Sequence, residues 1–410
     1  MIGQITYKHH PARLLLLLGC LLILASCAPS STSGNATPTA TRAPIVLTPQ
    51  PTKNPTLSDT ELATRIVQHM SLEEKLGQMV IVEFYGSTLN SNLQQTIQQS
   101  HISGVLIENK NGNAQTHAQL VALSQAMQSA AHIPLLISTD YEGGVVNELR
   151  QITGERPSNA QIGATGDPQQ AYKAGHAAAM DLSGLGLNVN FMPIVDVLVN
   201  ANNPGLPQRS FGADPKLVTD MGRAYLKGLT DGGIVGCLKH FPGLGSANLD
   251  PHYSLPHMDR SLATLNAVDL VPYRTLIREG NVPMVMVTHI SNPQLDPNLP
   301  TSLSPRVVTD LLRKDLNFQG VIISDTLWMG GISNTYSLSQ AAILAVKAGT
   351  DLLLGPRGLN EAQTMLYGLQ QAVQTGQIST NQIDASAVRI VALKLKYGII
   401  MHNEALQLAG

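Results

Sequence analysis

The chain has 410 residues, enough for one large domain or two small ones. Only 13% of its residues are charged and its formal net charge is −2, so it has neither the basic excess of a nucleic-acid-binding protein nor an acidic tail. Its three cysteines, Cys20, Cys27 and Cys237, are too few for a disulfide framework.

The first 26 residues have the pattern of a secretory signal peptide. Lys8 and Arg13 precede an apolar run from Leu14 to Ala25, which is too short to span a membrane. The run ends in Leu24-Ala25-Ser26-Cys27, which resembles the lipobox of bacterial lipoproteins. We expect cleavage before Cys27 and lipidation of its thiol, which would anchor the protein to the outer face of the cytoplasmic membrane. An ordinary signal peptide with an accidental cysteine is the alternative.

Residues 27–57 are rich in Ser, Thr, Pro, Asn and Ala and have no core-forming period. We expect a disordered tether there, followed by one folded domain over residues 58–410. Ser58-x-x-Glu61 and Ser71-x-x-Glu74 both fit the capping box, and they predict two helix starts at the beginning of this domain.

Eight short apolar runs follow, separated by helical or loop segments. Apolar runs that alternate with helices are typical of a parallel sheet covered on both faces. They predict an α/β fold, a (β/α)8 TIM-type barrel closed by a helix from Asn381 to Tyr397, with a doubly wound sheet as the alternative. The runs are Met79–Phe84, Gly104–Ile107, Pro134–Ser138, Leu187–Ile194, Ile234–Leu238, Pro283–Val287, Val321–Ile323 and Asp351–Leu354.

Polar side chains follow five of these runs, where the strands are expected to end. Barrel enzymes carry their catalytic groups at the C-terminal ends of the strands, so this pattern predicts a working site there. The residues are Asp140, Asp196, Lys239-His240, Thr288-His289 and Ser324-Asp325.

The most specific stretch of the chain runs from Lys239 to Pro256. It starts where the strand is expected to stop at Leu238, and its Pro-Gly-x-Gly sequence predicts a turn. On the following loop Asp250 lies two residues before His252, so its carboxylate can orient the imidazole and raise its pKa. Such a pair can act as acid and base near neutral pH, although an isolated Asp-x-His is usually an ordinary polar loop.

This stretch resembles the signature of the glycoside hydrolase family 3 β-N-acetylglucosaminidases, in which Lys-His-Phe-Pro-Gly opens the loop and Asp-x-His closes it. The resemblance extends over residues 60–398 and implies a TIM barrel. Ser324-Asp325-Thr326-Leu327-Trp328-Met329 is similar to the nucleophile motif, which implies that Asp325 attacks the anomeric carbon. Taken alone, Asp325 could equally be a helix N-cap.

Four further residues match the family's sugar contacts. Asp140 resembles an aspartate that accepts hydrogen bonds from sugar hydroxyls. Lys239, His240 and Arg209 match groups that contact the sugar, although Arg209 alone could form a surface ion pair. The twelve histidines form no His-x-x-x-His set, so we expect no metal and no cofactor.

The chain departs from the family pattern at several positions. Val145 and Glu148 stand where the family has two arginines, and Arg150 is two residues out of register. Leu244 replaces a histidine at the turn. Two residues have open roles: Trp328 could stack on a sugar or pack at the rim, and His289 could line the mouth or hold a loop.

The resemblance implies a monomeric, retaining exo-β-N-acetylglucosaminidase acting on oligosaccharide or muropeptide fragments. Asp325 would be the nucleophile, and His252, oriented by Asp250, the acid and base. A phosphorylase is an alternative, because a neutral imidazole would not repel phosphate. A β-glucosidase is less favoured, because those enzymes take their acid/base carboxylate from a further domain. From another class, a catalytically silent glycan-binding lipoprotein is supported by Val145, Glu148 and Leu244.

Overall fold

The computed structural model describes residues 57–409. The signal peptide, the lipidation site at Cys27 and most of the tether therefore lie outside the described residues. Among the helices of residues 57–409, none combines the length and the apolar character that a membrane crossing requires.

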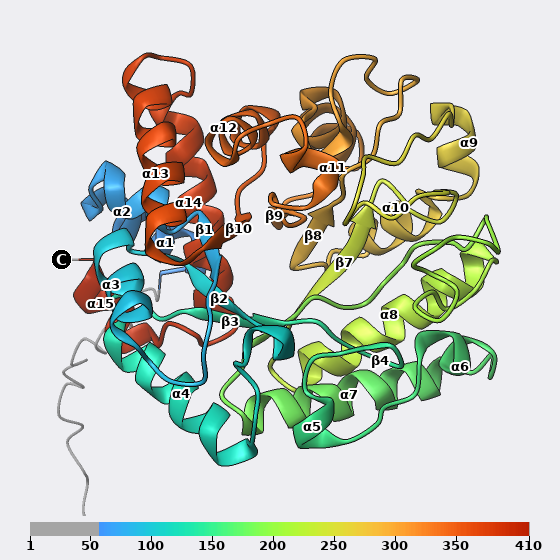
Figure 1. The fold of residues 1–410 in the computed structure, drawn as a ribbon, viewed down its shortest axis with the longest axis horizontal. Coiled ribbons are helices and arrows are strands. Elements are labelled where there is room, and N and C mark those ends of the chain that lie inside the picture. Colours follow the sequence, from blue (N-terminus) through green and yellow to red (C-terminus); the bar gives the residue numbers. More distant parts are fainter. Residues whose placement is uncertain (1–56, 410) are drawn as a thin grey trace, which may run out of the picture. The chain divides into compact units, whose positions relative to one another are not determined.

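Eight parallel strands form the centre of the fold, and helices surround them (Figure 1). The strands pair in the order β10-β1-β2-β3-β6-β7-β8-β9, and a parallel bridge between Ile323 and Leu352 joins the two ends of this order. The barrel is thus nearly closed, and the predicted TIM-type fold is confirmed. The strands are β1 (Val80–Glu83), β2 (Gly104–Ile107), β3 (Leu136–Thr139), β6 (Val189–Asn190), β7 (Val235–Phe241), β8 (Met284–Val287), β9 (Val321–Ser324) and β10 (Leu353–Arg357), and a small hairpin of β4 (Tyr141–Gly143) and β5 (Val146–Asn147) follows β3.

All strands but β2 differ from the predicted bounds, and β6, β7 and β10 end three or more residues from their predicted ends. The predicted end of the fifth strand at Leu238 is wrong, because β7 continues to Phe241, which pairs with Val287 of β8. Lys239 and His240 consequently extend from a strand rather than from a loop. In the opposite direction, β6 spans only Val189–Asn190 and ends four residues before the predicted Ile194.

Side-chain caps start the first helices as predicted. The hydroxyl of Ser58 accepts the N–H of Glu61 and that of Ser71 accepts the N–H of Glu74, with the reciprocal carboxylate contacts also present. The helices are α1 (Asp59–His69), α2 (Leu72–Gly77), α3 (Ser91–Ser100), η1 (Asn109–Asn111), α4 (His117–Ala130), α5 (Arg150–Thr153), α6 (Asn159–Gly163), α7 (Pro168–Gly184), α8 (Pro215–Asp231), α9 (Leu262–Ala267), α10 (Val271–Arg278), η2 (Thr301–Leu303), the π-helix η3 (Arg306–Asp315), α11 (Gly330–Ser333), α12 (Leu338–Ala348), α13 (Gly358–Gln374), α14 (Thr380–Lys396) and α15 (His402–Leu408).

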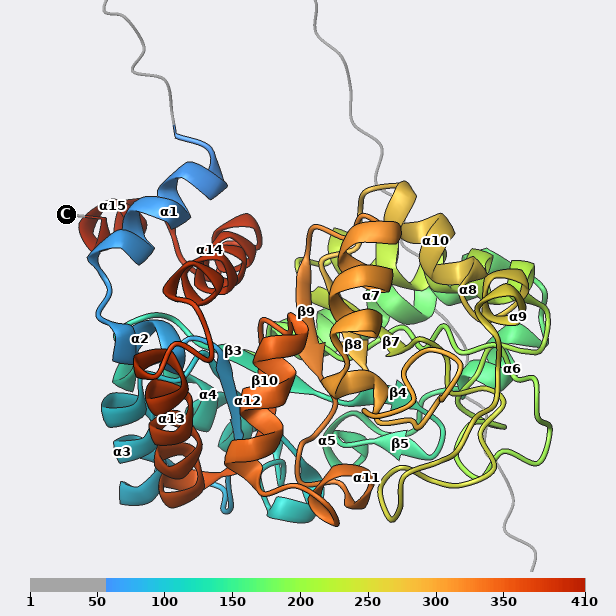
Figure 2. The ribbon, with the colours of Figure 1, turned by 90° about the horizontal axis from the view of Figure 1, so that it is seen from above.

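Helices α1, α14 and α15 pack together at one edge of the barrel (Figure 2). They share a small apolar core separate from the main one, to which Leu62, Val391 and Ala405 contribute. Thr60 of α1 lines a cavity together with Pro283 and Gly320, which lie just before β8 and β9. The first helix therefore lies at the N-terminal end of the barrel.

Candidate active site

All seven residues predicted for the site line one cavity of about 210 Å³. Residues from the ends of β7 and β8 and from the segment after β9 surround it, so it lies at the C-terminal end of the barrel. Barrel enzymes place their chemistry at this end. The seven residues are Asp140, Arg209, Lys239, His240, Asp250, His252 and Asp325.

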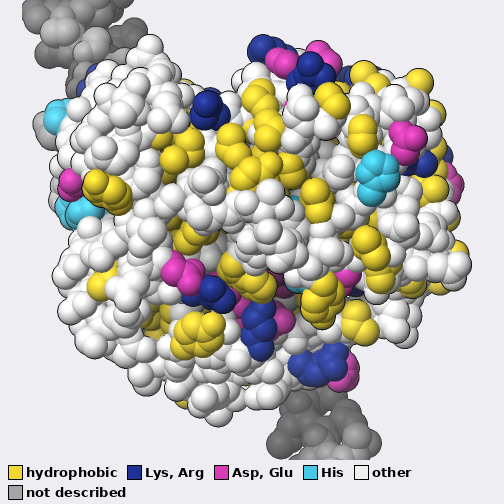
Figure 3. Space-filling view, turned by 45° about the horizontal axis from the view of Figure 1, so that its top comes forward, with side chains coloured by type: hydrophobic (Ala, Val, Ile, Leu, Met, Phe, Trp, Pro, Cys, Tyr) yellow, Lys and Arg dark blue, Asp and Glu magenta, His cyan; other side chains and the backbone are white. Residues whose placement is uncertain are grey.

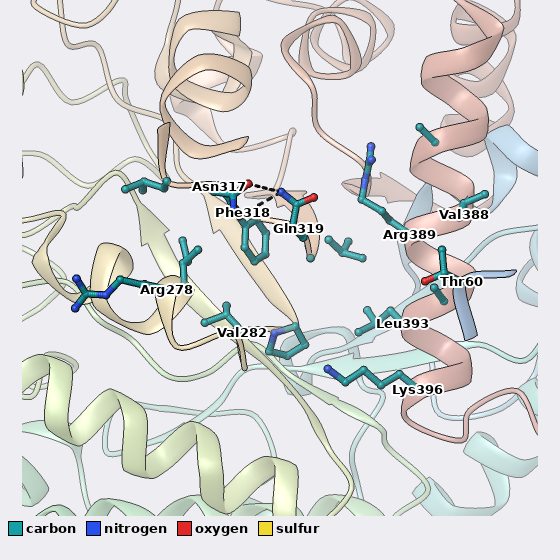
Figure 4. A pocket seen from close by; sticks show the side chains of 18 of the residues that line it. Thr60, Arg278, Val282, Asn317, Phe318, Gln319, Val388, Arg389, Leu393 and Lys396 are labelled. Carbon is teal, nitrogen blue, oxygen red and sulfur yellow. Dashed lines mark hydrogen bonds between the residues drawn. The ribbon is translucent and has the colours of Figure 1, made fainter. Parts of the chain in front are cut away.

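A larger cavity, of about 1120 Å³, lies at the opposite end of the barrel (Figure 4). It is bounded by α10, α14 and the segment before β9, and its walls contain Arg278, Phe318 and Lys396. No histidine lines it, and none of the predicted catalytic residues does. Size alone therefore does not identify the site, and the smaller cavity is the candidate.

Asp325 follows β9 directly and is held by two hydrogen bonds. One carboxylate oxygen accepts the N–H of Thr326 at 2.8 Å, and the other accepts the hydroxyl of Thr288 at 3.1 Å. Burial acts to raise the pKa of this carboxyl, but nearby histidines, His289 first, and the Thr326 N–H outweigh it, so the pKa lies below its usual range. The group is thus ionised and fixed at the cavity wall, as a carboxylate nucleophile requires.

His252 and Asp250 form the predicted dyad. The His252 Nδ1–H donates to a carboxylate oxygen of Asp250 at 2.6 Å, and the backbone N–H of His252 donates to the same oxygen at 3.0 Å. About half of the His252 side chain is exposed, so its ring remains accessible from the cavity. Backbone hydrogen bonds from Gly330 to His252 and from Gly331 to Pro251 connect this loop to the segment after Asp325.

Glu142 is fully buried and joins two of the predicted sugar contacts. It accepts two hydrogen bonds from Arg209, at 2.7 and 2.8 Å, and one from the ammonium of Lys239 at 2.8 Å. Burial would raise the pKa of Glu142, but Arg209 and Lys239 lower it to about 2. Lys239 also pairs with Asp140, and the two carboxylates keep its pKa above the usual range despite burial. Arg209 is therefore not a surface ion pair.

Asp196 does not line the cavity but positions a residue that does. Its carboxylate is completely buried and accepts a hydrogen bond from Nδ1 of His240 at 2.7 Å. It also accepts the backbone N–H of Leu244 at 2.6 Å, which ties the turn to the strand end. The Lys239–His240 peptide bond is cis. No sequence motif assigned this positioning to Asp196, although its place after an apolar run was a signal.

The residues named above as departures from the family pattern lie in different places. Two of them line the cavity and two lie outside it. Glu148 lines the cavity and accepts the N–H of Asn109 at 2.6 Å, whereas Val145 is exposed and outside it. Arg150 also lies outside the cavity, because its guanidinium donates to the carbonyl of Gly144. Leu244 forms part of the cavity wall.

Trp328 and His289 have different environments. Trp328 lines the cavity, its indole N–H donates to Glu83, and the ammonium of Lys110 lies 5.0 Å from the ring centroid. His289 is buried outside the cavity, where it contacts Ser302 at 2.7 Å and donates to the carbonyl of Thr326 at 3.0 Å. His289 therefore holds a loop.

Residues 57–409 contain no group of three His, Cys, Asp or Glu side chains arranged to hold a metal ion. The face in Figure 3 carries charged side chains of both signs in small groups among largely uncharged surface.

Comparison with known proteins identifies the family of the chain. Residues 71–393 match the family model of the glycosyl hydrolase family 3 N terminal domain. Beta-hexosaminidase A of Pseudoalteromonas piscicida is 35% identical over 336 residues, covering 76% of this chain and 56% of that protein. Beta-hexosaminidase LpqI of Mycobacterium tuberculosis is 33% identical over 337 residues, covering 79% and 83%. The structure of a glycoside hydrolase family 3 beta-N-acetylglucosaminidase from Paenibacillus sp. str. FPU-7 has a TM-score of 0.78 and 34% identity, covering 83% of this chain and 68% of that one. The chain therefore belongs to glycosyl hydrolase family 3 and is a glycoside hydrolase.

Proposed function

We propose that the protein is a retaining exo-β-N-acetylglucosaminidase that removes terminal N-acetylglucosamine from cell-wall fragments. One observation carries this proposal: Asp325 and the Asp250–His252 dyad line the same cavity as the predicted sugar contacts. The relatives named beta-hexosaminidase and beta-N-acetylglucosaminidase support the choice of sugar.

In the first step an oxygen of Asp325 forms a bond to the anomeric carbon as the bond to the leaving oxygen breaks. His252 gives the leaving oxygen a proton from Nε2, because its Nδ1–H is donated to Asp250. The low pKa of Asp325 keeps the attacking oxygen ionised at neutral pH.

In the second step water attacks the anomeric carbon, His252 takes a proton from that water, and the carboxylate of Asp325 is released. Asp140 accepts hydrogen bonds from sugar hydroxyls, and Lys239, His240 and Arg209 donate to hydroxyl or acetamido oxygens. The buried network through Glu142 holds these donors before the substrate arrives, which lowers the cost of ordering them in the transition state.

A phosphorylase is the second candidate, and the imidazole of His252 favours it. An imidazole that has given up its proton is neutral, so it does not repel an incoming phosphate as a carboxylate would. Running the enzyme with and without inorganic phosphate separates the two activities. Hydrolysis yields free N-acetylglucosamine in both cases, whereas phosphorolysis yields the sugar 1-phosphate.

Turnover of an aryl N-acetyl-β-glucosaminide by the full chain is the direct test. We expect release of the phenol by the wild type and none by Asp325→Ala. A wild type that binds N-acetylglucosamine oligomers without turning over the aryl glycoside would instead be a silent glycan-binding protein.

We also propose that the protein is exported and lipid-anchored at Cys27, with residues 28–57 as its tether and residues 58–410 as its catalytic domain. The support is the motif Leu24-Ala25-Ser26-Cys27 and the polar composition of the segment after it.

A further inference from the structure

The larger cavity, of about 1120 Å³, lies at the N-terminal end of the barrel and takes no part in the proposed reaction. We call it the basal cavity. Its walls come from α1 and α14 on one side and from α10 and the segment before β9 on the other (Figure 2). None of the predicted catalytic residues lines it, so a ligand bound there would be separate from the substrate.

The basal cavity is apolar in its depth and polar at its rim. Phe318, Leu316 and Pro283 line it and are buried, whereas Asn317 and Gln319 line it and are exposed. The side-chain amide of Gln319 donates to the amide oxygen of Asn317 at 2.8 Å, so these two groups stand together at the rim. A ligand with a charged part outside and an uncharged part inside would match this order.

Three exposed cations stand at the rim: Arg274, Arg278 and Lys396. The guanidinium of Arg274 donates to the uncharged amide of Asn266 at 2.6 Å. Arg278 and Lys396 form no ion pair with another residue of 57–409. The positive charge of these side chains is therefore available to an anion.

Two acidic residues, Asp59 and Asp315, also line the basal cavity, but they are outnumbered. Arg389 is a fourth cation of the lining, and it shares the buried carboxylate of Asp351 with Arg313, so this group retains one positive charge. The lining thus has four cationic side chains against two acidic ones, which favours an anionic ligand.

The cations approach the cavity from opposite sides. Arg278 is the last residue of α10 and Lys396 is the last residue of α14, and the ring of Phe318 lies between them in the view of Figure 4. Guanidinium and ammonium groups placed on two sides of an opening suit the oxygens of a phosphate, which accepts from several donors.

The chain enters the folded domain beside this cavity, because Asp59 and Thr60 in the first turn of α1 line it. The proposed anchor at Cys27 precedes Leu57 by about thirty residues, and a coil of that length spans about 30 Å on average. An anchored protein would therefore meet lipid head groups at an effective concentration in the millimolar range, so that even weak lipid binding would be occupied.

We infer that the basal cavity binds the head group of an anionic phospholipid, with its phosphate between Arg278 and Lys396 and its uncharged end inside the rim. In phosphatidylglycerol that end is a glycerol, whose hydroxyls suit the amides of Asn317 and Gln319. The inference goes beyond the proposed hydrolysis, and it uses the proposed anchor only to bring the membrane near.

The test measures binding to lipid vesicles without the anchor. The mature chain from residue 27 with Cys27→Ser carries neither signal peptide nor lipid, and both apolar cores of the barrel lie within residues 57–409. Sedimentation with vesicles should show binding when about one-third of the lipid is phosphatidylglycerol and none with phosphatidylcholine alone. Each cation near an anionic surface contributes roughly fivefold, so Arg278→Glu with Lys396→Glu should weaken binding at least tenfold. Arg278→Lys with Lys396→Arg keeps both charges and should retain binding.

A matched control separates the cavity from net charge. Lys173→Glu with Lys216→Glu makes the same change in charge at two exposed positions that do not line the basal cavity. This variant should bind the phosphatidylglycerol vesicles as the parent does. Thermal unfolding of every variant checks that the fold is retained.

Three results would overturn the inference. The first is equal binding of both vesicle types, and the second is an equal loss of binding in the matched control. The third is a dimer, seen by light scattering, that dissociates in Arg278→Glu with Lys396→Glu, since a second copy would then occupy the cavity. Failure of the proposed hydrolysis or of the anchor gives a different result, namely no turnover or a soluble wild type in cells, and leaves vesicle binding unchanged.

Discussion

The imidazole of His240 is hydrogen-bonded at 2.7 Å to the carboxylate of Asp196, which has no exposed surface. The same carboxylate also receives the N–H of Leu244, so one buried group connects a strand end to the turn after it. A side chain that never reaches the cavity thus sets the direction of one that lines it.

Asp196→Asn should lower kcat/KM without unfolding the protein. The amide has the shape of the carboxylate, but it cannot accept both hydrogen bonds equally well and leaves His240 poorly directed. We expect a loss of roughly tenfold to a hundredfold, the scale of a small misplacement in a reacting site. Kinetics on the aryl glycoside measure this loss, and thermal unfolding is the control. Wild-type kinetics in the variant would show that the contact to Asp196 is dispensable.

Asp325 and His252 should respond differently to the leaving group. Asp325→Ala removes the nucleophile and should abolish turnover of every substrate. His252→Ala should slow natural glycosides most, because a good aryl leaving group departs without a proton. Water activation remains impaired, so the glycosyl-enzyme should accumulate as a burst and azide should restore turnover with a β-glycosyl azide product. Equal slowing on both substrates without a burst would mean that another residue is the acid and base.

Substitutions at Asp140 and Glu142 should have different effects, one mainly on kcat/KM and the other mainly on the free energy of unfolding. Asp140→Ala should lower kcat/KM by roughly two to three orders of magnitude, as for a lost charged hydrogen bond of about 3–4 kcal/mol. Lys239 keeps Glu142 as a partner in that variant, so little stability is lost. Glu142→Ala instead leaves Arg209 and Lys239 buried without it and should lower the free energy of unfolding by about 3–5 kcal/mol. Urea unfolding of both variants makes the comparison, and similar curves would contradict it.

Lys394 should make stability depend on pH. It is buried in α14, its ammonium contacts Gln78 at 2.8 Å, and burial lowers its pKa to about 7. An unfolded lysine has a pKa of about 10.4, so between these values the unfolded chain binds more protons than the folded one. The free energy of unfolding therefore rises from about pH 7 to about pH 10, by up to about 1.4 kcal/mol per pH unit.

Lys394→Met should remove that rise and stabilise the protein at pH 7. Lys396→Met, two residues on and exposed, should retain it and serves as the control. Urea unfolding at pH 7 and pH 9.5 gives the slopes. Parallel pH dependences in the wild type and in Lys394→Met would show that Lys394 is not the source.

Cys27→Ser tests the proposed anchor. The variant should lose lipidation, and the domain should be released or left unprocessed with the activity of the soluble domain unchanged. Fractionation of cells and kinetics on the released protein measure these two effects. Wild type found unmodified in the soluble exported fraction would exclude an anchor at Cys27.

Sequence predicted the parts of the site that follow local rules. The eight apolar runs indicated the barrel, and Asp140, Lys239 and Asp325 were identified because polar residues at strand ends meet at one edge. The roles of Glu142 and Asp196 were not predictable from spacing. Each acts through a partner more than 40 residues away, Glu142 through Arg209 and Asp196 through His240, and only folding brings these pairs together.

The position of α1 has a practical consequence. Its first turn lies beside the residues that precede β8 and β9, whereas the catalytic cavity opens at the other end of those strands. Any cargo, bead or display scaffold joined ahead of Leu57 is attached at the end of the barrel opposite the entrance to the cavity. Immobilisation directly at Leu57, without the preceding tether, would thus hold the entrance of the cavity away from the support and leave it open to bulky substrates.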